Sequence, residues 1–238
     1  MAKYLNLLIS QSIWFSRSDL LEDSFEGSTT RASKNEVANL NKLMMKGLPD
    51  VEKQLMEAAD RETNFSHKTR THTYLNSWRM GDEESEAMWR IYGKDYGIAI
   101  ISSLSQIKAS LLGEEEIFGG SITYANYDDV KLPWGNIFSP FLYKRKSFEH
   151  ENEFRLLFWD SESSLGKNLN HQVDCGTLQA EAEIGKLLPV NLNSLITVVH
   201  VTPRAPNWYF ESVQAITKQL GYSFEVTRSS EGVNAPLF

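Results

Sequence analysis

Apolar residues recur along this chain at two spacings, and each spacing predicts a different element. Apolar positions that repeat every three or four residues predict amphipathic helices, whereas apolar residues that alternate with polar ones, or that form short β-branched and aromatic runs, predict strands. The helices expected from the first pattern cover residues 2–10, 34–47, a segment from Asp50 onward, 82–93, 104–112, 138–146 and 207–220. The strands expected from the second pattern cover residues 12–16, 71–78, 97–101, 120–127, 149–159, 195–201 and 222–227. The continuous apolar run at 97–101 predicts a buried strand.

These helices and strands are mixed along the whole sequence, which predicts an α+β fold. We expect mostly antiparallel sheets with helices packed on their outer faces. The last three elements, a strand, a helix and a strand, resemble a βαβ unit. The chain has no internal repeat and no Gly-, Ser- or Pro-rich linker, so we expect one domain over residues 1–238, with a polar loop at 161–170.

The predicted strand over residues 149–159 has the most informative pattern. Alternation of side chains along a strand would place Glu149, Glu151, Glu153 and Arg155 on one face. Neighbours on one face lie roughly 6.5–7 Å apart, so three carboxylates in a row repel one another unless a cation or a ligand lies among them. The basic run that begins at Lys144 could supply that cation.

Two interpretations of this acidic strand follow. In the first, Glu151 and Glu153 form a rigid carboxylate pair that shifts the pKa of one member or binds a polar ligand. In the second, they form a solvated row of ion pairs that Arg155 closes.

Composition excludes several classes of function. The chain has 238 residues, of which 41% are hydrophobic, and its 24 basic and 31 acidic residues give a net charge of −7 and a pI of about 5.3. Such an acidic chain has no general attraction for nucleic acid, although a local basic patch could bind a small anion. The single cysteine, Cys175, excludes an intramolecular disulfide and a cysteine-built zinc site.

Common sequence motifs are also missing. The five histidines have no metal-binding spacing, and the chain contains no dinucleotide-binding glycine motif, P-loop or nucleophile elbow. The N-terminal residues do not form a signal peptide, and no apolar stretch approaches the roughly 20 residues of a membrane span. We therefore expect a cytoplasmic protein.

Two further groups of side chains have both a structural and a functional interpretation. Trp78, Trp89 and Tyr92 suit an aromatic core, but an exposed member could stack on a base or a nicotinamide ring. Ser102 and Ser103 follow a predicted strand. Serines there usually cap a helix, but one of them could orient a nearby carboxylate.

Five sequence blocks stand out by their order and spacing, at residues 13–17 with 23–27, 74–78, 84–92, 97–102 and 144–155. Together they resemble the DUF2971 family of bacterial and phage proteins, and the resemblance covers about residues 3–220. The chain differs from the family at Ser24, where proline is expected, and at Ser77 and Arg79, where cysteine and histidine are expected. The family implies no established activity.

The order arginine, serine and Glu-x-Glu also resembles ADP-ribosyltransferases. The resemblance implies that NAD⁺ is the substrate, that Glu153 binds its ribose, and that Glu151 orients or deprotonates the acceptor. It further implies that Arg17 holds the pyrophosphate and that Ser102 fixes the glutamate. The remaining residues expected to contact the nucleotide are the aromatic and basic candidates Trp78, Trp89, Tyr92, Lys144 and Arg155.

We therefore expect an NAD⁺-using transferase or glycohydrolase that acts as an effector in bacterial or phage conflict, with a protein acceptor or an antitoxin as its partner. A second hypothesis is a module that binds a nucleotide or another anionic metabolite without turning it over. A third is a metal-dependent nuclease or phosphoesterase that binds Mg²⁺ at Glu151 and Glu153.

Overall fold

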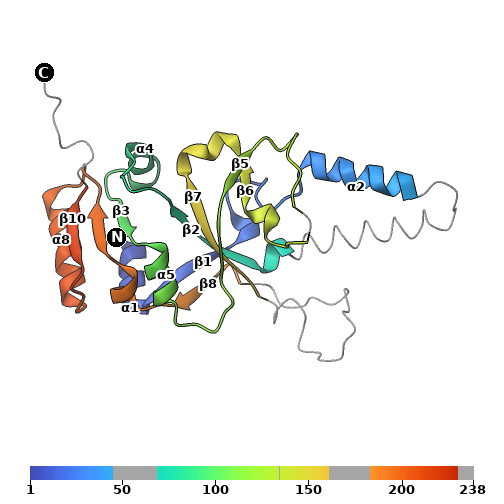
Figure 1. Ribbon diagram of the computed structural model, residues 1–238. Coiled ribbons are helices and arrows are strands. Elements are labelled where there is room, and N and C mark those ends of the chain that lie inside the picture. Colours follow the sequence, from blue (N-terminus) through green and yellow to red (C-terminus); the bar gives the residue numbers. More distant parts are fainter. Residues whose placement is uncertain (45–68, 134, 161–182, 230–238) are drawn as a thin grey trace, which may run out of the picture. The chain divides into compact units, whose positions relative to one another are not determined.

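The expected α+β architecture with mostly antiparallel sheets is confirmed by the structure. A computed structural model describes residues 1–44, 69–133, 135–160 and 183–229 (Figure 1). Its contacts divide the chain into two compact units. Unit 1 comprises Met1–Trp14, Gly81–Glu114 and Leu187–Phe238, and unit 2 comprises Phe15–Met80 and Glu115–Lys186.

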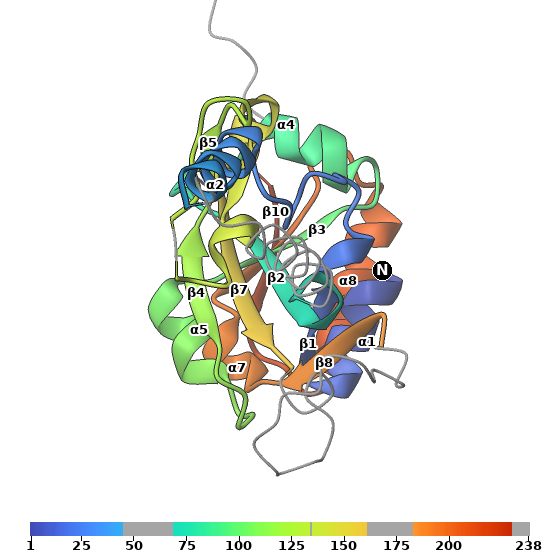
Figure 2. The same ribbon diagram turned by 90° about the vertical axis from the view of Figure 1, so that its right-hand side faces the viewer.

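Unit 2 is built around a sheet whose strand order is β4-β7-β2-β1-β8. The sheet's strands are β1 (Ser12–Arg17), β2 (Thr73–Arg79), β4 (Phe118–Ser121), β7 (Glu153–Trp159) and β8 (Gly185–Pro189). β1 and β8 each continue from one unit into the other. β7 pairs antiparallel with β2 over seven residues and with β4 on its other side, and Figure 2 shows these strands side by side.

The two faces of β7 carry different chemistry. On one face, Leu157 packs with Leu75, Phe138 and Phe141 in a buried core. Glu153 and Arg155 lie on the same face of the strand as Leu157 because they are two and four residues away from it. The opposite face is aromatic, and the ring of Phe158 stacks on that of Tyr74. The polar residues of β7 therefore lie on the face that packs against a hydrophobic core.

Shorter elements complete unit 2. Among the described residues, its helices include the α-helix α2 (Arg31–Met44) and the 3-10 helices η1 (Ser18–Leu20), η3 (Ser139–Phe141) and η4 (Lys146–Glu151). A second, two-stranded sheet pairs β5 (Thr123–Ala125) in parallel with β6 (Tyr143–Arg145).

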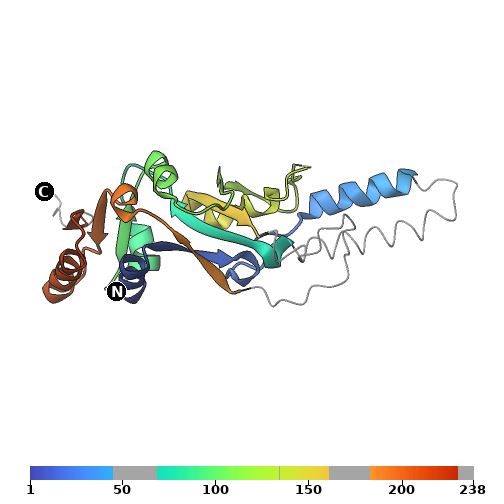
Figure 3. The ribbon, with the colours of Figure 1, turned by 90° about the horizontal axis from the view of Figure 1, so that it is seen from below.

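Unit 1 contains a three-stranded sheet in the order β10-β9-β3. Its elements are α1 (Ala2–Ser10), α4 (Glu86–Met88), the π-helix η2 (Trp89–Gly93), β3 (Ile98–Ile101), α5 (Leu104–Ser110), α7 (Leu192–Leu195), β9 (Val198–Val201), α8 (Asn207–Gln219) and β10 (Glu225–Arg228). β9 and β10 are parallel and are joined through α8, which confirms the predicted βαβ unit. Figure 3 shows α8 beside β10.

Four sequence predictions need correction. The expected helix 82–93 is one short α-helical turn that continues as a π-helix. The expected strand 120–127 is two strands, which pair with different partners on either side of Ile122. The expected helix 138–146 is a 3-10 turn with Pro140 in its first positions, followed by β6, because residues 143–145 pair with β5. The strand 97–101, expected to be buried, is only partly buried.

The prediction of a single domain over residues 1–238 stays a prediction. The predicted helix from Asp50 and the loop at 161–170 lie outside the described residues, as does Cys175. In the part of the chain that the structure describes, no helix combines the length and the apolar composition needed to cross a membrane.

The packing of β7 predicts a large effect for a core truncation. Leu157 is fully buried, so Leu157→Ala should lower the free energy of unfolding by about 2–5 kcal/mol, because the cavity left behind collapses only in part. Leu20, which is 52% exposed in the same unit, provides the matched control, and Leu20→Ala should cost less than about 1 kcal/mol. Urea unfolding of both variants measures the difference, and equal losses would contradict the described core.

Candidate functional site

Four of the predicted site residues come together in unit 2. Their side chains form a buried group with a fifth residue, Glu26, which we name the carboxylate–cation cluster. Its members are Glu26, Lys144, Glu151, Glu153 and Arg155, each less than a tenth exposed. The cluster holds one more carboxylate than cations.

Lys144 lies among all three carboxylates. Its Nζ is 2.6 Å from Oε2 of Glu151, 3.1 Å from Oε1 of Glu26 and 3.4 Å from Oε2 of Glu153. An ammonium group has three N–H donors, so one lysine can serve three acceptors. The spacing of the acidic residues predicted a cation among them, and Lys144 of the protein itself is that cation.

Arg155 joins two of the same carboxylates from the other side. Its Nε donates to Oε1 of Glu153 at 2.5 Å, and its Nη2 donates to Oε2 of Glu153 at 3.0 Å and to Oε2 of Glu26 at 2.5 Å. Nη1 donates to the carbonyl oxygen of Phe141 at 2.9 Å. The planar guanidinium is only 1% exposed and binds Glu153 through two parallel hydrogen bonds, the strong geometry for this pair.

The local backbone differs from the single strand that the sequence predicted over residues 149–159. Residues Lys146–Glu151 form a 3-10 helix, and Asn152 then adopts a left-handed conformation, with φ 43° and ψ 59°. Asparagine tolerates that conformation better than most residues. The strand begins only at Glu153, and Glu149 lies exposed outside the cluster. Glu151 reaches Lys144 from the helix, not from the strand face that alternation predicted.

Two further segments bring in Lys144 and Glu26. Lys144 lies on β6, opposite Tyr124 of β5. Glu26 comes from the loop before α2, where the N–H of Gly27 donates to the carbonyl oxygen of Pro140. Gly27 has a φ of 70°, and a Cβ there would lie 2.4 Å from the ring of Phe141, so only glycine lets this loop approach closely.

The cluster keeps Glu153 and Lys144 charged. Burial raises the pKa of Glu153, but the hydrogen bonds and charge of Arg155, together with Ser77 and Lys144, outweigh burial and hold that pKa below its ordinary value. Burial lowers the pKa of Lys144, but Glu151, Glu153 and Glu26 outweigh it and raise that pKa overall. At neutral pH, Glu153 is therefore a carboxylate and Lys144 an ammonium.

Three residues that the sequence analysis did not select surround Glu153. Ser77 lies on β2 opposite Arg155, is exposed, and forms a side-chain hydrogen bond with Glu153. Arg79, also exposed, lies directly opposite Glu153. The hydroxyl oxygen of Tyr124 accepts a hydrogen bond from the backbone N–H of Glu153 at 2.8 Å. Ser77 is in the predicted strand 71–78 and Arg79 directly follows it, so alternation along β2 was the signal that could have found them.

Arg17 and Trp78 lie away from the cluster. Arg17 pairs with Tyr74, which pairs with Phe158, so its side chain lies on the aromatic face of the sheet. Phe158 is five residues, or roughly 17 Å, along β7 from Glu153, and the Nε of Arg17 binds Asp19 at 2.7 Å. Trp78 is opposite Phe154 and is likewise on the aromatic face. The structure therefore does not place Arg17 beside Glu153, and its expected role in holding the pyrophosphate stays a prediction.

The other four candidates belong to unit 1. Ser102 donates its hydroxyl hydrogen to the carbonyl oxygen of Leu195 at 2.6 Å, and Ser103 caps α5. Trp89 is buried, and its Nε1 donates to Glu84 at 2.7 Å, whereas Tyr92 is exposed. Within unit 2, Ser77 is the serine that bonds to Glu153.

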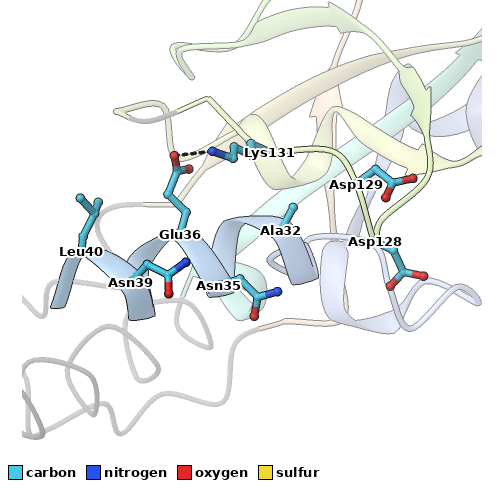
Figure 4. Close-up of a pocket in the computed structure, with 8 residues that line it drawn as sticks. All are labelled: Ala32, Asn35, Glu36, Asn39, Leu40, Asp128, Asp129 and Lys131. Carbon is cyan, nitrogen blue, oxygen red and sulfur yellow. Dashed lines mark hydrogen bonds and ion pairs between the residues drawn. The ribbon is translucent and has the colours of Figure 1, made fainter. Parts of the chain in front are cut away.

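A hollow of about 560 Å³ lies elsewhere in unit 2 (Figure 4). One wall is the face of α2 that carries Asn35 and Asn39, and the other is the turn at residues 128–131, where Lys131 binds Glu36 at 2.7 Å. None of the predicted site residues lines it. Among the described residues, no group of three or more His, Cys, Asp or Glu side chains is arranged to hold a metal ion.

Comparison with known proteins finds no matching family model, no matching curated protein and no matching solved structure. The resemblances to DUF2971 and to ADP-ribosyltransferases therefore stay predictions, and the cluster itself is the basis for assigning chemistry.

The lowered pKa of Glu153 predicts how stability depends on pH. Because the folded pKa lies below the ordinary value of 4.5, the unfolded chain binds more protons in this acidic range. The contribution of Glu153 to the free energy of unfolding is therefore complete above pH 4.5 and is lost as the pH falls through the folded pKa. Urea unfolding at a series of pH values gives the free energy of unfolding as a function of pH. Glu153→Gln should make the fall of this free energy at acidic pH, the acid limb of the curve, less steep.

Glu149→Gln is the matched control because it changes the same kind of side chain outside the cluster. It should leave the acid limb as steep as in the wild type. Equal flattening in both variants would show that general charge, and not the cluster, governs acid stability.

Proposed function

We propose that this chain cleaves NAD⁺ between nicotinamide and ribose and transfers the ADP-ribose to a protein acceptor or to water. The single observation that carries the proposal is Glu153: a carboxylate held ionised by Arg155 and Lys144, with an exposed serine hydroxyl bonded to it. Buried groups with shifted pKa values and specific charge partners are candidates for functional sites.

The reaction needs such a carboxylate. When the bond between ribose C1′ and the nicotinamide nitrogen breaks, nicotinamide leaves with the bonding electron pair and a positive charge develops on the ribose, as in glycoside hydrolysis. A fixed carboxylate beside that sugar stabilises the developing charge and accepts a hydrogen bond from a ribose hydroxyl. The acceptor then forms a bond to C1′ and gives up its proton.

The roles follow from the positions of the side chains around Glu153. Glu153 binds the ribose, and Glu151, which shares Lys144 with it, takes the proton of the acceptor. Ser77 fixes the carboxylate of Glu153 from the exposed side. Arg79, exposed opposite Glu153, is in the position to hold the pyrophosphate, the role first expected of Arg17.

A second function, nucleotide binding without turnover, is favoured by one specific observation. Every carboxylate of the cluster already has a charged partner, and Glu153 is only 5% exposed. Such a fixed charge group could recognise an anionic metabolite through Arg79 and leave it intact. Thermal stabilisation by NAD⁺ that is recovered unchanged would support this function over the first.

Replacing the ribose-binding carboxylate tests the proposed reaction directly. Glu153→Gln should lower the rate of nicotinamide release from NAD⁺ by at least about 100-fold, the typical effect of removing one electrostatic group at a reacting centre. Chromatography of the products measures the release, and circular dichroism with the melting temperature establishes that the variant is folded.

Glu26→Gln is the matched control. It also removes one carboxylate bonded to Arg155 and Lys144, but Glu26 does not bind the ribose in the proposed mechanism. A folded Glu26→Gln should keep most of its activity. If the wild type releases no nicotinamide, or if Glu153→Gln releases it at the wild-type rate, the transferase proposal fails.

Ser77 gives a second prediction with little risk to folding, because it is exposed. Ser77→Ala should lower kcat by about 10-fold, since it removes only one hydrogen bond that orients Glu153. The melting temperature should stay within about 2 °C of the wild type, because surface substitutions change stability little. Ser77→Thr keeps the hydroxyl and should recover the activity, whereas a Ser77→Ala variant as active as the wild type would remove Ser77 from the site.

A further inference from the structure

The edge strand β4 differs from the opposite edge of the same sheet. An unpaired sheet edge attracts other strands, and proteins usually protect it with lysine, proline or a bulge. β8 carries such protection in Lys186 and Pro189. β4 has the sequence Phe-Gly-Gly-Ser, with neither lysine nor proline, and pairs only with β7 among the described residues.

The pairing register shows which backbone groups of β4 face outward. The N–H of Ile122 donates to the carbonyl oxygen of Glu153 at 2.9 Å, so Gly120, two residues earlier, also bonds toward β7. In an antiparallel pair the residues between these positions point their N–H and C=O groups away from the partner strand. Gly119 and Ser121 hold those positions, and both are exposed.

The side chains beside this edge have a definite character. Glu115 and Glu116 precede the strand and are exposed, and Phe118 at its start is 47% exposed. The glycines cannot be replaced easily, because a Cβ on Gly119 would lie 2.8 Å from the ring of Phe154. The edge therefore combines accessible backbone groups, one apolar ring and two negative charges.

We propose that β4 binds an extended, basic peptide segment of a partner protein by adding it to the sheet as a further strand. Backbone hydrogen bonds to Gly119 and Ser121 supply affinity in this mode of recognition, and neighbouring side chains supply specificity. A segment that runs antiparallel to β4 brings its C-terminal residues alongside Glu115 and Glu116, so those residues are lysine or arginine.

The position of this edge also suggests what the peptide is for. Ile122, which follows β4, pairs with Glu153, and an added strand would lie two strand spacings, or about 10 Å, from β7. We therefore assign the bound segment to the protein acceptor of ADP-ribose. This assignment rests on the proposed transferase function, whereas the docking of the peptide does not.

A fluorescent probe peptide tests the docking without NAD⁺. The probe alternates threonine and valine over seven residues and ends in two lysines, and fluorescence anisotropy measures its binding. Ser121→Pro removes the outward N–H without removing a bond to β7 and should weaken binding at least tenfold. Ser121→Ala keeps that N–H and should stay within twofold of the wild type. A probe that ends in two glutamates should bind at least tenfold more weakly.

The outcomes separate the two proposals. Equal binding to the wild type and to a folded Ser121→Pro, or equal binding of the lysine and glutamate probes, overturns the docking of a basic peptide. A wild-type dimer that Ser121→Pro dissociates in analytical ultracentrifugation would also overturn it, because a second copy would then occupy the edge. Ser121-dependent binding in a protein that releases no nicotinamide keeps the docking site and removes the transferase function.

Discussion

The buried guanidinium of Arg155 constrains how unit 2 can fold. An arginine removed from water destabilises a protein by several kcal/mol unless carboxylates and carbonyl groups satisfy it. Here Glu153 comes from the same strand, Glu26 from a loop about 130 residues earlier, and the carbonyl oxygen of Phe141 from a 3-10 turn. Because this one buried side chain has to be neutralised, three segments that are distant in sequence have to lie next to one another in the folded unit.

Lys144 extends the same constraint. It contacts all three carboxylates, so the removal of any one member leaves a buried charge with fewer partners. A hydrophobic group of similar size could fill this space at lower cost in desolvation. Five ionisable side chains beside a hydrophobic core are therefore a costly arrangement, and the proposed reaction at Glu153 would give their charges a use.

The sequence predicts the elements of this fold better than it predicts the site. Helices and strands with a clear period, such as α1, α8 and β2, follow from local patterns of side chains. The break at Asn152 does not, because no alternation rule contains its left-handed conformation or the contact between Glu151 and Lys144. Glu26 joins the cluster only through the close approach of Gly27 to Pro140.

The difference between the expected and the observed neighbours of Glu153 has a similar origin. Arg17 and Ser102 were grouped with it by their order along the chain, whereas the strand register brings Ser77 and Arg79 to it. Register depends on tertiary contacts between strands. A sequence alone therefore indicates which residues could react, and the pairing of β2 with β7 determines which of them meet.

The division of the chain into two interleaved units has a consequence for its synthesis. The chain passes between the units four times, and unit 2 ends at Lys186, whereas unit 1 needs the residues from Leu187 onward. As the ribosome releases the chain from its N-terminus, unit 2 can close first. The N-terminal helix α1 can make its native contacts only after α8 has been synthesised, because Tyr4 of α1 is hydrogen-bonded to Thr217 of α8. The helix that is synthesised first is thus among the last to pack.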